Sequence, residues 1–325
     1  MRYFFRATQV FLLSVTGIPL FAQELISGNT PLSWAYAINT PGIEDPFVYN
    51  VPHTVPDSEL AFTFTLPRNL YEPPDWHPKD HPAMPDIVAN GRNPGVFPCS
   101  YCHLPNGQGR PENTNLTGLS REYIIQQMAD WRAGLRQSSE PLHGPASAMH
   151  AIGVNATAKE AEEAADYFAS LPARQWIRVI ETDTVPETVV LGWMYVEKNN
   201  GGSEAIGNRI LEMPEDLERT ELRDDRSGFI AYVPTGSVDQ GKTLVENGKS
   251  GANTICTTCH GDDLRGLGPI PPLAGRSPSY IARQLYDFQV GNRRGLWSPL
   301  MQAAVEDLTL EDIVAISAYS ASLEP

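Results

Sequence analysis

Two short motifs hold all four cysteines of this 325-residue chain: Cys99-Ser-Tyr-Cys102-His103 and Cys256-Thr-Thr-Cys259-His260. Each motif places two thiols one helical turn apart and follows them at once with a histidine. This is the attachment pattern of a c-type haem, in which the thiols add to the two vinyl groups and the histidine ligates the iron. The motifs therefore predict two covalently bound haem c groups and a fold built around them.

Three other uses of paired cysteines compete with this interpretation. Each pair could close a local disulfide, the four thiols could share a structural zinc ion, or a C-x-x-C pair could be a thioredoxin-like redox site. None of these explains why a histidine follows both pairs, so covalent haem remains the leading hypothesis.

An internal repeat surrounds the motifs. Shifting the chain by the spacing from His103 to His260 aligns identical residues on both sides of each motif, which indicates two haem domains of one design. The aligned pairs include Leu116 with Leu273, Ser120 with Ser277, Tyr123 with Tyr280, Ile124 with Ile281, Gln127 with Gln284, Asp130 with Asp287, Gly134 with Gly291 and Arg136 with Arg293.

The repeat also locates candidates for the sixth iron ligand. Past a five-residue surplus in the first copy, Met149 aligns with Met301, and each is expected in a loop eight residues before a helix-capping threonine. A thioether ligand stabilises ferrous iron and raises the reduction potential. A methionine can instead fill a core, and at the first haem the adjacent His150 or His143 could take the methionine's place.

Helix signals in both copies predict short helices around each haem. Ser120 and Ser277, followed in the second copy by Pro278, begin one helix per copy, and Gly134 and Gly291 end them. Capping boxes are expected at Thr157–Glu160 and Thr309–Asp312, and a further one at Ser237–Gln240. The predicted fold is mainly α.

With these residues in view, the chain resembles the cytochrome c4-type dihaem proteins. The likeness rests on the C-x-x-C-H motifs, the Tyr-Ile-x-x-Gln-x-x-Asp-aromatic-x-x-Gly-x-Arg segment, the following methionine and the closing Ala-Tyr-x-Ala-Ser-Leu helix, over residues 86–171 and 237–323. It implies tandem class I cytochrome c domains and His/Met ligation at both irons. The implied site residues are Cys99, Cys102, His103 and Met149, and Cys256, Cys259, His260 and Met301.

The expected organisation has five parts. An apolar stretch after two arginines predicts a signal peptide over residues 1–22, too short to span a bilayer. A Pro-rich extension (residues 23–84) precedes haem domain 1 (residues 85–175), an inserted linker or small β segment (residues 176–236) follows, and haem domain 2 covers residues 237–325. Family members have a short linker, so the insert puts their close pairing of haems in doubt.

These observations favour a periplasmic carrier that moves single electrons between redox proteins, and not an enzyme. The net charge of −15 disfavours nucleic-acid partners, and no segment after the signal peptide is long and apolar enough to cross a membrane. The alternatives are the haem subunit of a periplasmic dehydrogenase, a dihaem peroxidase, or a binding module without haem. The donor and acceptor are not specified by the sequence.

Overall fold

The computed structural model describes residues 30–199, 201–249 and 255–325. The predicted signal peptide, residues 1–22, lies outside these residues. Within them, no helix combines the length and the hydropathy that a membrane span requires.

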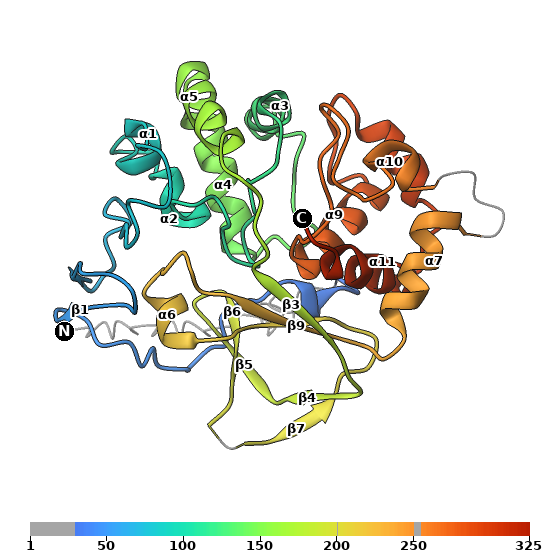
Figure 1. The fold of residues 1–325 in the computed structure, drawn as a ribbon, viewed down its shortest axis with the longest axis horizontal. Helices are drawn as coiled ribbons and strands as arrows, with labels where there is room; N and C mark the ends of the chain where they lie inside the picture. Colours follow the sequence, from blue (N-terminus) through green and yellow to red (C-terminus); the bar gives the residue numbers. More distant parts are fainter. Residues whose placement is uncertain (1–29, 200, 250–254) are drawn as a thin grey trace, which may run out of the picture.

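Haem domain 1 contains five helices in the described structure: α1 (Asp86–Ala89), α2 (Cys99–His103), α3 (Arg121–Arg132), α4 (Gly144–Asn155) and α5 (Ala158–Ala169) (Figure 1). The capping signals explain two of the starts. The Ser120 hydroxyl accepts from the Tyr123 amide, and Thr157 forms a complete capping box with Glu160. Gly134 follows α3 with φ of +66°, a conformation that favours glycine.

Haem domain 2 repeats this plan in α7 (Ser237–Asn247), α8 (Thr257–His260), α9 (Pro278–Gln289), α10 (Ser298–Val305) and α11 (Leu310–Ser322). Ser277 caps α9, and Thr309 forms a capping box with Asp312, as predicted. The capping box expected at Ser237 is wrong. Gly236, in the left-handed region, is the N-cap of α7, and the Ser237 hydroxyl is buried without a partner among the described residues.

Each haem domain has its own apolar core. In domain 1, Val88, Ile124 and Phe168 bring together α1, α3 and α5. In domain 2, Val245, Ile281 and Ile313 do the same for α7, α9 and α11. Equivalent helices therefore form the apolar core of each domain, as the sequence repeat predicts.

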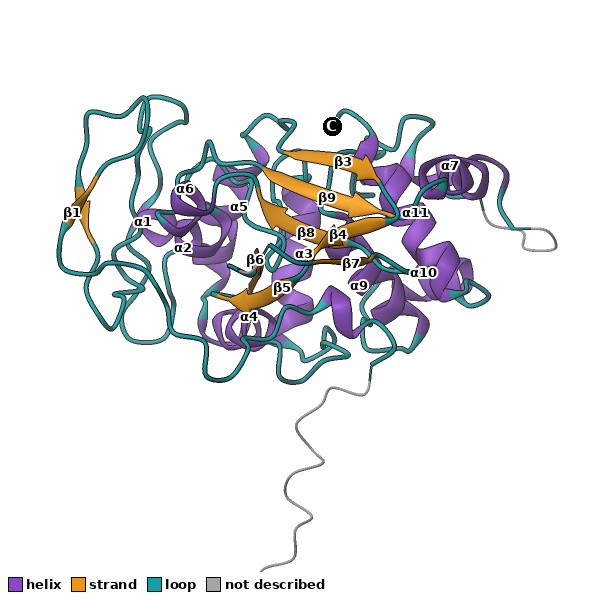
Figure 2. Cartoon of the chain, turned by 90° about the horizontal axis from the view of Figure 1, so that it is seen from below, coloured by secondary structure: helices purple, strands orange, loops and turns teal. Residues whose placement is uncertain are grey.

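The insert is a folded β unit. Strand β3 (Ile177–Glu181) pairs in parallel with β9 (Phe229–Val233), which pairs antiparallel with β8 (Leu211–Pro214). Two small antiparallel pairs join β4 (Thr184–Pro186) to β7 (Ser203–Ala205) and β5 (Thr188–Leu191) to β6 (Met194–Glu197), and α6 (Leu217–Glu221) precedes β9. Figures 1 and 2 show these strands together on one side of the molecule, beneath the helices of both domains in the view of Figure 1.

The insert contacts both haem domains. Its buried Glu212 accepts hydrogen bonds from the Ser277 hydroxyl at 2.7 Å and the Ser279 amide at 2.9 Å, at the start of α9. Its Arg223 lies 3.9 Å from the ring centre of Tyr101, inside the first cysteine motif, and donates to the Tyr101 carbonyl at 2.5 Å. The segment therefore joins the two domains through specific polar contacts.

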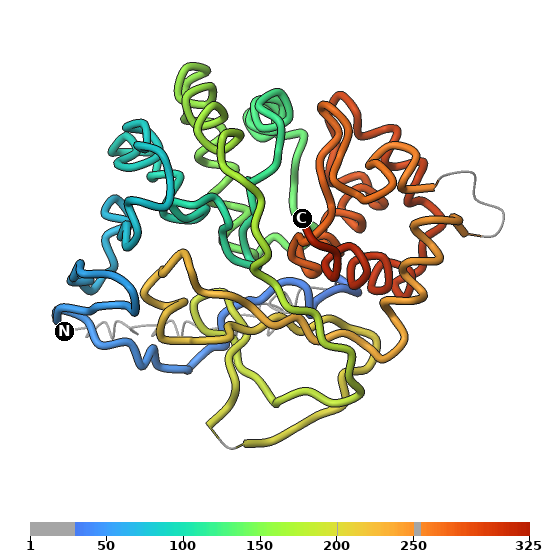
Figure 3. Tube along the Cα trace, viewed as in Figure 1, coloured from blue at the N-terminus to red at the C-terminus, as the bar shows by residue number. Residues whose placement is uncertain are grey.

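The extension runs along the insert from one haem domain to the other (Figure 3). Near its start the extension forms the short 3-10 helix η2 (Ser33–Ala35). Leu32, just before this helix, and Ala35, its last residue, belong to the core of domain 2. Further along, Phe64 and Trp76 pack against Leu222 of the insert. Within the alternating Phe-Thr-Phe-Thr sequence of residues 62–65, the structure has a two-residue strand, β2 (Phe62–Thr63), paired with β1 (Pro52–His53).

Candidate haem sites and the interface between them

Helix α2 presents the first cysteine motif to the interior of domain 1. Cys99, Cys102 and His103 line one cavity, together with Met149 of α4. Burial raises the pKa of the Cys99 thiol to about 12 and also raises that of Cys102, so both thiols are neutral at physiological pH.

The alternative uses of the cysteines find no support in this arrangement. All four are free thiols, and the two pairs lie in different domains. Among the described residues, the only set of potential ligands close enough to share a metal ion contains no cysteine. A four-cysteine zinc site would need the two pairs side by side.

The two motif histidines have the same hydrogen-bond geometry. His103 Nδ1 lies 2.9 Å from the Thr114 carbonyl oxygen, and His260 Nδ1 lies 2.8 Å from the Pro271 carbonyl oxygen, each eleven residues along the chain. A carbonyl can only accept, so Nδ1 carries the proton and Nε2 keeps its lone pair. Burial lowers the pKa of both imidazoles. Each histidine is thus a neutral, oriented donor suited to ligating iron.

The candidate sixth ligands of haem domain 1 occupy different environments. Met149 and His143 line the cavity of the cysteine motif, whereas His150 is exposed and is not among the lining residues. His143 is 3% exposed, and its Nε2 has no hydrogen-bond partner among the described residues. Burial, with a smaller contribution from Arg283, lowers the pKa of His143 to about 3, so this imidazole is neutral.

The prediction that both methionines lie in loops is wrong. Met149 is in α4 and Met301 is in α10. Each of these helices carries a proline in its first turn, where the missing amide hydrogen costs nothing. Met301 and Cys256 both pack against the core of domain 2, so the methionine faces the core that also receives the second motif.

The interface between the haem domains is built from the repeat itself. Arg136 of domain 1 and Arg293 of domain 2 are each 7% exposed and form an isolated antiparallel bridge. Backbone bonds extend it: the Gln137 amide donates to the Asn292 carbonyl at 2.9 Å, and the Arg294 amide donates to the Leu135 carbonyl at 2.6 Å. The two domains are therefore in direct contact despite the insert.

The arginine side chains cross this interface and exchange partners. Arg136 donates to Tyr280 Oη at 2.8 Å and to Gln284 Oε1 at 2.9 Å, while Arg293 donates to Tyr123 Oη at 2.6 Å and to Gln127 Oε1 at 2.9 Å. The contacts are therefore reciprocal: each arginine binds the tyrosine and the glutamine at equivalent positions of the opposite domain.

The interface network also lines the cavity of domain 1, which Arg136, Tyr280 and Gln284 share with His103. Burial would raise the pKa of Tyr280, but the two neighbouring arginines outweigh burial and lower it. Two buried arginine charges therefore act on this part of the cavity wall.

In the sequence these interface residues are matches of the repeat, and no local pattern marks them as parts of a site. Identical polar residues at equivalent positions of both copies are the sequence signal from which this interface could have been predicted. Residues from outside the haem domains carried no such signal: Tyr36 of the extension lines the same cavity, and nothing in the local sequence of the extension points there.

No protein-family model matches the chain. Among characterised proteins, it is 32% identical over 135 residues to cytochrome c4 of Stutzerimonas stutzeri, covering 37% of this chain and 63% of that protein. It is 40% identical over 70 residues to cytochrome c-554(548) of Halomonas halodenitrificans, covering 21% of this chain and 84% of that protein.

A third relative is similar over a longer stretch. The thiosulfate dehydrogenase electron acceptor of Stutzerimonas stutzeri is 22% identical over 236 residues, covering 72% of this chain and 82% of that protein. By contrast, the chain spans less than two thirds of the length of the cytochrome c4 that it matches. Taken with the two motifs, the likeness to cytochrome c-554(548) means that the chain belongs to the c-type cytochromes, which carry haem c, and among them it is similar to cytochrome c4.

Proposed function

We propose that this protein is a periplasmic electron carrier that passes single electrons between redox proteins through two covalently bound haems. The observation that carries the proposal is the matched pair of histidines, each fixed through Nδ1 by a backbone carbonyl so that Nε2 is free for iron. Two such sites in one chain suit electron transfer, because each haem iron exchanges one electron when the group is bound.

The residues that would hold the cofactors follow from the two motifs. Cys99 and Cys102 would attach one haem, with His103 and Met149 on its two faces. The equivalent set in domain 2 is Cys256, Cys259, His260 and Met301. In the first set the two cysteines, His103 and Met149 line one cavity, whereas Cys259 of the second set is exposed.

The interface favours electron exchange within the chain. Arg136 lies in the wall of the first cavity and acts on the pKa of His103, Arg293 acts on the pKa of His260, and the two arginines form a bridge across the interface. The arginines offer positive charge to the carboxylates of a bound haem. Fixed donors of this kind need little reorganisation when the charge of a site changes.

A second candidate is the haem-bearing subunit of a periplasmic dehydrogenase. The relative named for accepting electrons from thiosulfate dehydrogenase favours it, since this chain covers most of that protein. On this proposal the donor is a dehydrogenase that oxidises a small anionic substrate. The dihaem peroxidase alternative would require one iron with a displaceable ligand.

A spectroelectrochemical titration of the full-length holoprotein tests the proposal. We expect a pyridine haemochrome of two haem c per chain, two one-electron steps, and no binding of carbon monoxide to the ferrous protein at neutral pH. Rapid carbon monoxide binding at one haem, with peroxide turnover, would contradict the carrier and favour the peroxidase. Absence of haem would contradict both.

A further inference from the structure

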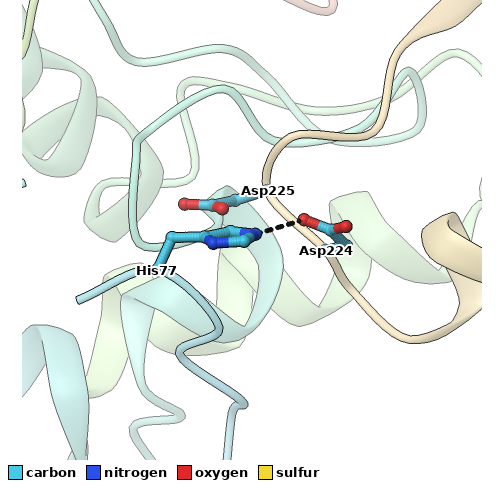
Figure 4. Close-up of side chains that lie close together, drawn as sticks. All are labelled: His77, Asp224 and Asp225. Atoms are coloured by element: carbon cyan, nitrogen blue, oxygen red, sulfur yellow. Dashed lines mark hydrogen bonds and ion pairs between the residues drawn. The ribbon is translucent and has the colours of Figure 1, made fainter. Parts of the chain in front are cut away.

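A second kind of site lies outside the haem cavities, where the extension meets the insert. His77 of the extension faces Asp224 and Asp225, which follow α6 in the insert (Figure 4). His77 Nε2 lies 3.0 Å from Asp224 Oδ1. One potential ligand atom from each of the three side chains lies within 4.8 Å of the other two.

The three side chains are almost completely removed from solvent. The side chains of His77 and Asp224 are 2% and 0% exposed, and Asp225 is 6% exposed as a residue. Carboxylates are almost never buried to this extent unless a cation or hydrogen-bond donors compensate them.

The two aspartates differ in their partners. Asp224 Oδ2 accepts from Arg219 Nε at 2.7 Å, and its Oδ1 accepts from the Arg226 amide at 3.0 Å. Neither carboxylate oxygen of Asp225 has a hydrogen-bond partner among the described residues. Figure 4 shows this carboxylate lying over the His77 ring. A buried carboxylate without hydrogen-bond donors favours the binding of a cation, which would compensate its charge.

The charged side chains around this carboxylate form ion pairs with other groups. Arg226 forms an ion pair with Asp80 at 2.7 Å, and His81 bonds to Asp75 at 3.2 Å. The nearby cations are therefore already paired with other carboxylates, as Arg219 is with Asp224.

We propose that His77, Asp224 and Asp225 bind one divalent cation of the zinc type. One imidazole and two carboxylates match the ligand preference of Zn²⁺, which accepts mixed nitrogen and oxygen donors and completes its tetrahedron with water. Ca²⁺ takes six to eight oxygens, and Mg²⁺ keeps several of its waters, so a dry site with one nitrogen suits neither.

The observed spacing is compatible with such a site. Ligand atoms about 2.0–2.2 Å from a tetrahedral Zn²⁺ lie about 3.3 Å from one another. The separation of His77 Nε2 and Asp224 Oδ1, 3.0 Å, is already close to that value. The ligand atom of Asp225 lies at most 4.8 Å from each of the other two ligand atoms. Each of these two separations therefore needs to shorten by at most about 1.5 Å to reach the value for a tetrahedral site.

The cation would tie three segments of the chain together. His77 belongs to the extension and the aspartates to the insert, while the Asn106 amide of haem domain 1 donates to the Asp225 carbonyl. Asn106 is three residues after His103, the proposed iron ligand. The Trp76 indole also donates to the Leu222 carbonyl at 2.7 Å, so packing already aligns the two segments. The bound cation would thus brace the loop on the histidine side of haem 1.

The test is metal binding by the full-length holoprotein. Protein stripped with a chelator is titrated with ZnCl₂ by calorimetry, and metal content is measured beside iron. We expect one Zn²⁺ for every two irons, a thermal midpoint that rises with Zn²⁺, and no comparable response to CaCl₂ or MgCl₂. Asp225→Asn, which keeps the shape of the side chain, should weaken Zn²⁺ binding by on the order of tenfold or more.

Asp262→Asn, an exposed aspartate of domain 2, is the matched control and should bind Zn²⁺ like the wild type. His77→Gln provides a second ligand variant if Asp225→Asn loses the haem spectrum. Wild-type protein that binds no Zn²⁺, with a midpoint indifferent to chelator and metal, would overturn the proposal and leave a hydrogen-bonded ionic cluster. Equal Zn²⁺ affinity in Asp225→Asn and Asp262→Asn, or preference for Ca²⁺, would overturn it as well.

Discussion

Arg136 and Arg293 face one another across the domain interface, and each donates a hydrogen bond to a tyrosine of the opposite domain. Arg136 donates to Tyr280, and Arg293 donates to Tyr123. Because both copies of the repeat have an arginine and a tyrosine at these positions, the same arginine–tyrosine hydrogen bond forms twice across the interface. Both arginines are buried, so their charges depend on these partners for compensation.

Replacing one interface arginine should destabilise the whole molecule. Arg136→Ala leaves the Tyr280 hydroxyl with one buried donor fewer, and we expect the free energy of unfolding of the holoprotein to fall by about 3 kcal/mol. Denaturant titration followed by circular dichroism measures this. The control is Arg178→Ala, whose exposed ion pair with Glu215 should be worth about 0.5 kcal/mol or less. Equal losses in the two variants would contradict the role of the interface.

Removing one cysteine pair should remove one haem. Cys99→Ala with Cys102→Ala eliminates the first attachment site, while Cys256 and Cys259 are unchanged in their separate domain. Mass spectrometry should show two haem masses added to the wild-type chain and one to the variant. A variant that still carried two covalent haems would show that attachment does not depend on this pair.

Met149→Ala should abolish the methionine-to-iron charge-transfer band of one haem and lower that haem's reduction potential, because the thioether stabilises ferrous iron. His143→Ala is the comparison, since His143 lines the same cavity and is neutral. We expect that variant to keep the band. The opposite pattern, with the band intact in Met149→Ala and the potential changed in His143→Ala, would assign the ligand to His143. Met301→Ala provides the parallel test in domain 2.

The Arg92–Glu160 pair should contribute acid-sensitive stability to haem domain 1. Hydrogen bonding from Arg92, opposed by partial burial and helped by the Thr157 amide, lowers the pKa of Glu160 to about 2. A lowered pKa stabilises the folded state at pH values above the ordinary pKa of 4.5, and this stabilisation is lost as the pH falls toward 2.

Glu160→Gln should therefore lower stability at pH 7 by about 1 kcal/mol and flatten its decline between those pH values. Thermal unfolding across this range measures both effects. Glu163→Gln, on the same helix with a solvent-exposed lysine partner, is the control. A decline of the same steepness in Glu160→Gln and wild type would contradict the assignment.

The acidic charge should steer encounter with a redox partner that presents a basic patch. At a net charge of −15 the protein attracts such a surface over a distance set by the Debye length, about 8 Å at physiological ionic strength. We expect stopped-flow rates of electron transfer to fall as salt is added. Rates that stayed flat or rose would indicate docking through an apolar surface instead.

The sequence by itself determined the chemistry and the local plan of the haem domains. Each C-x-x-C-H motif joins ligand and attachment groups in five consecutive residues, and caps such as Thr157 act within one helical turn, so no distant residue is needed to recognise them. The methionines were located by the repeat, although their helices were missed because the prolines of α4 and α10 were not recognised as first-turn residues.

Only the tertiary structure decided which surfaces meet. The pairing of Arg136 with Tyr280, the entry of Tyr36 into the first cavity, and the approach of His77 to Asp224 join segments that are distant in the sequence. Nothing in a local pattern encodes such contacts, because they depend on how the two domains, the insert and the extension pack against one another. Burial then sets the chemistry of these groups, since an aspartate such as Asp225 is ordinary in sequence and becomes a candidate ligand only when water and donors are excluded.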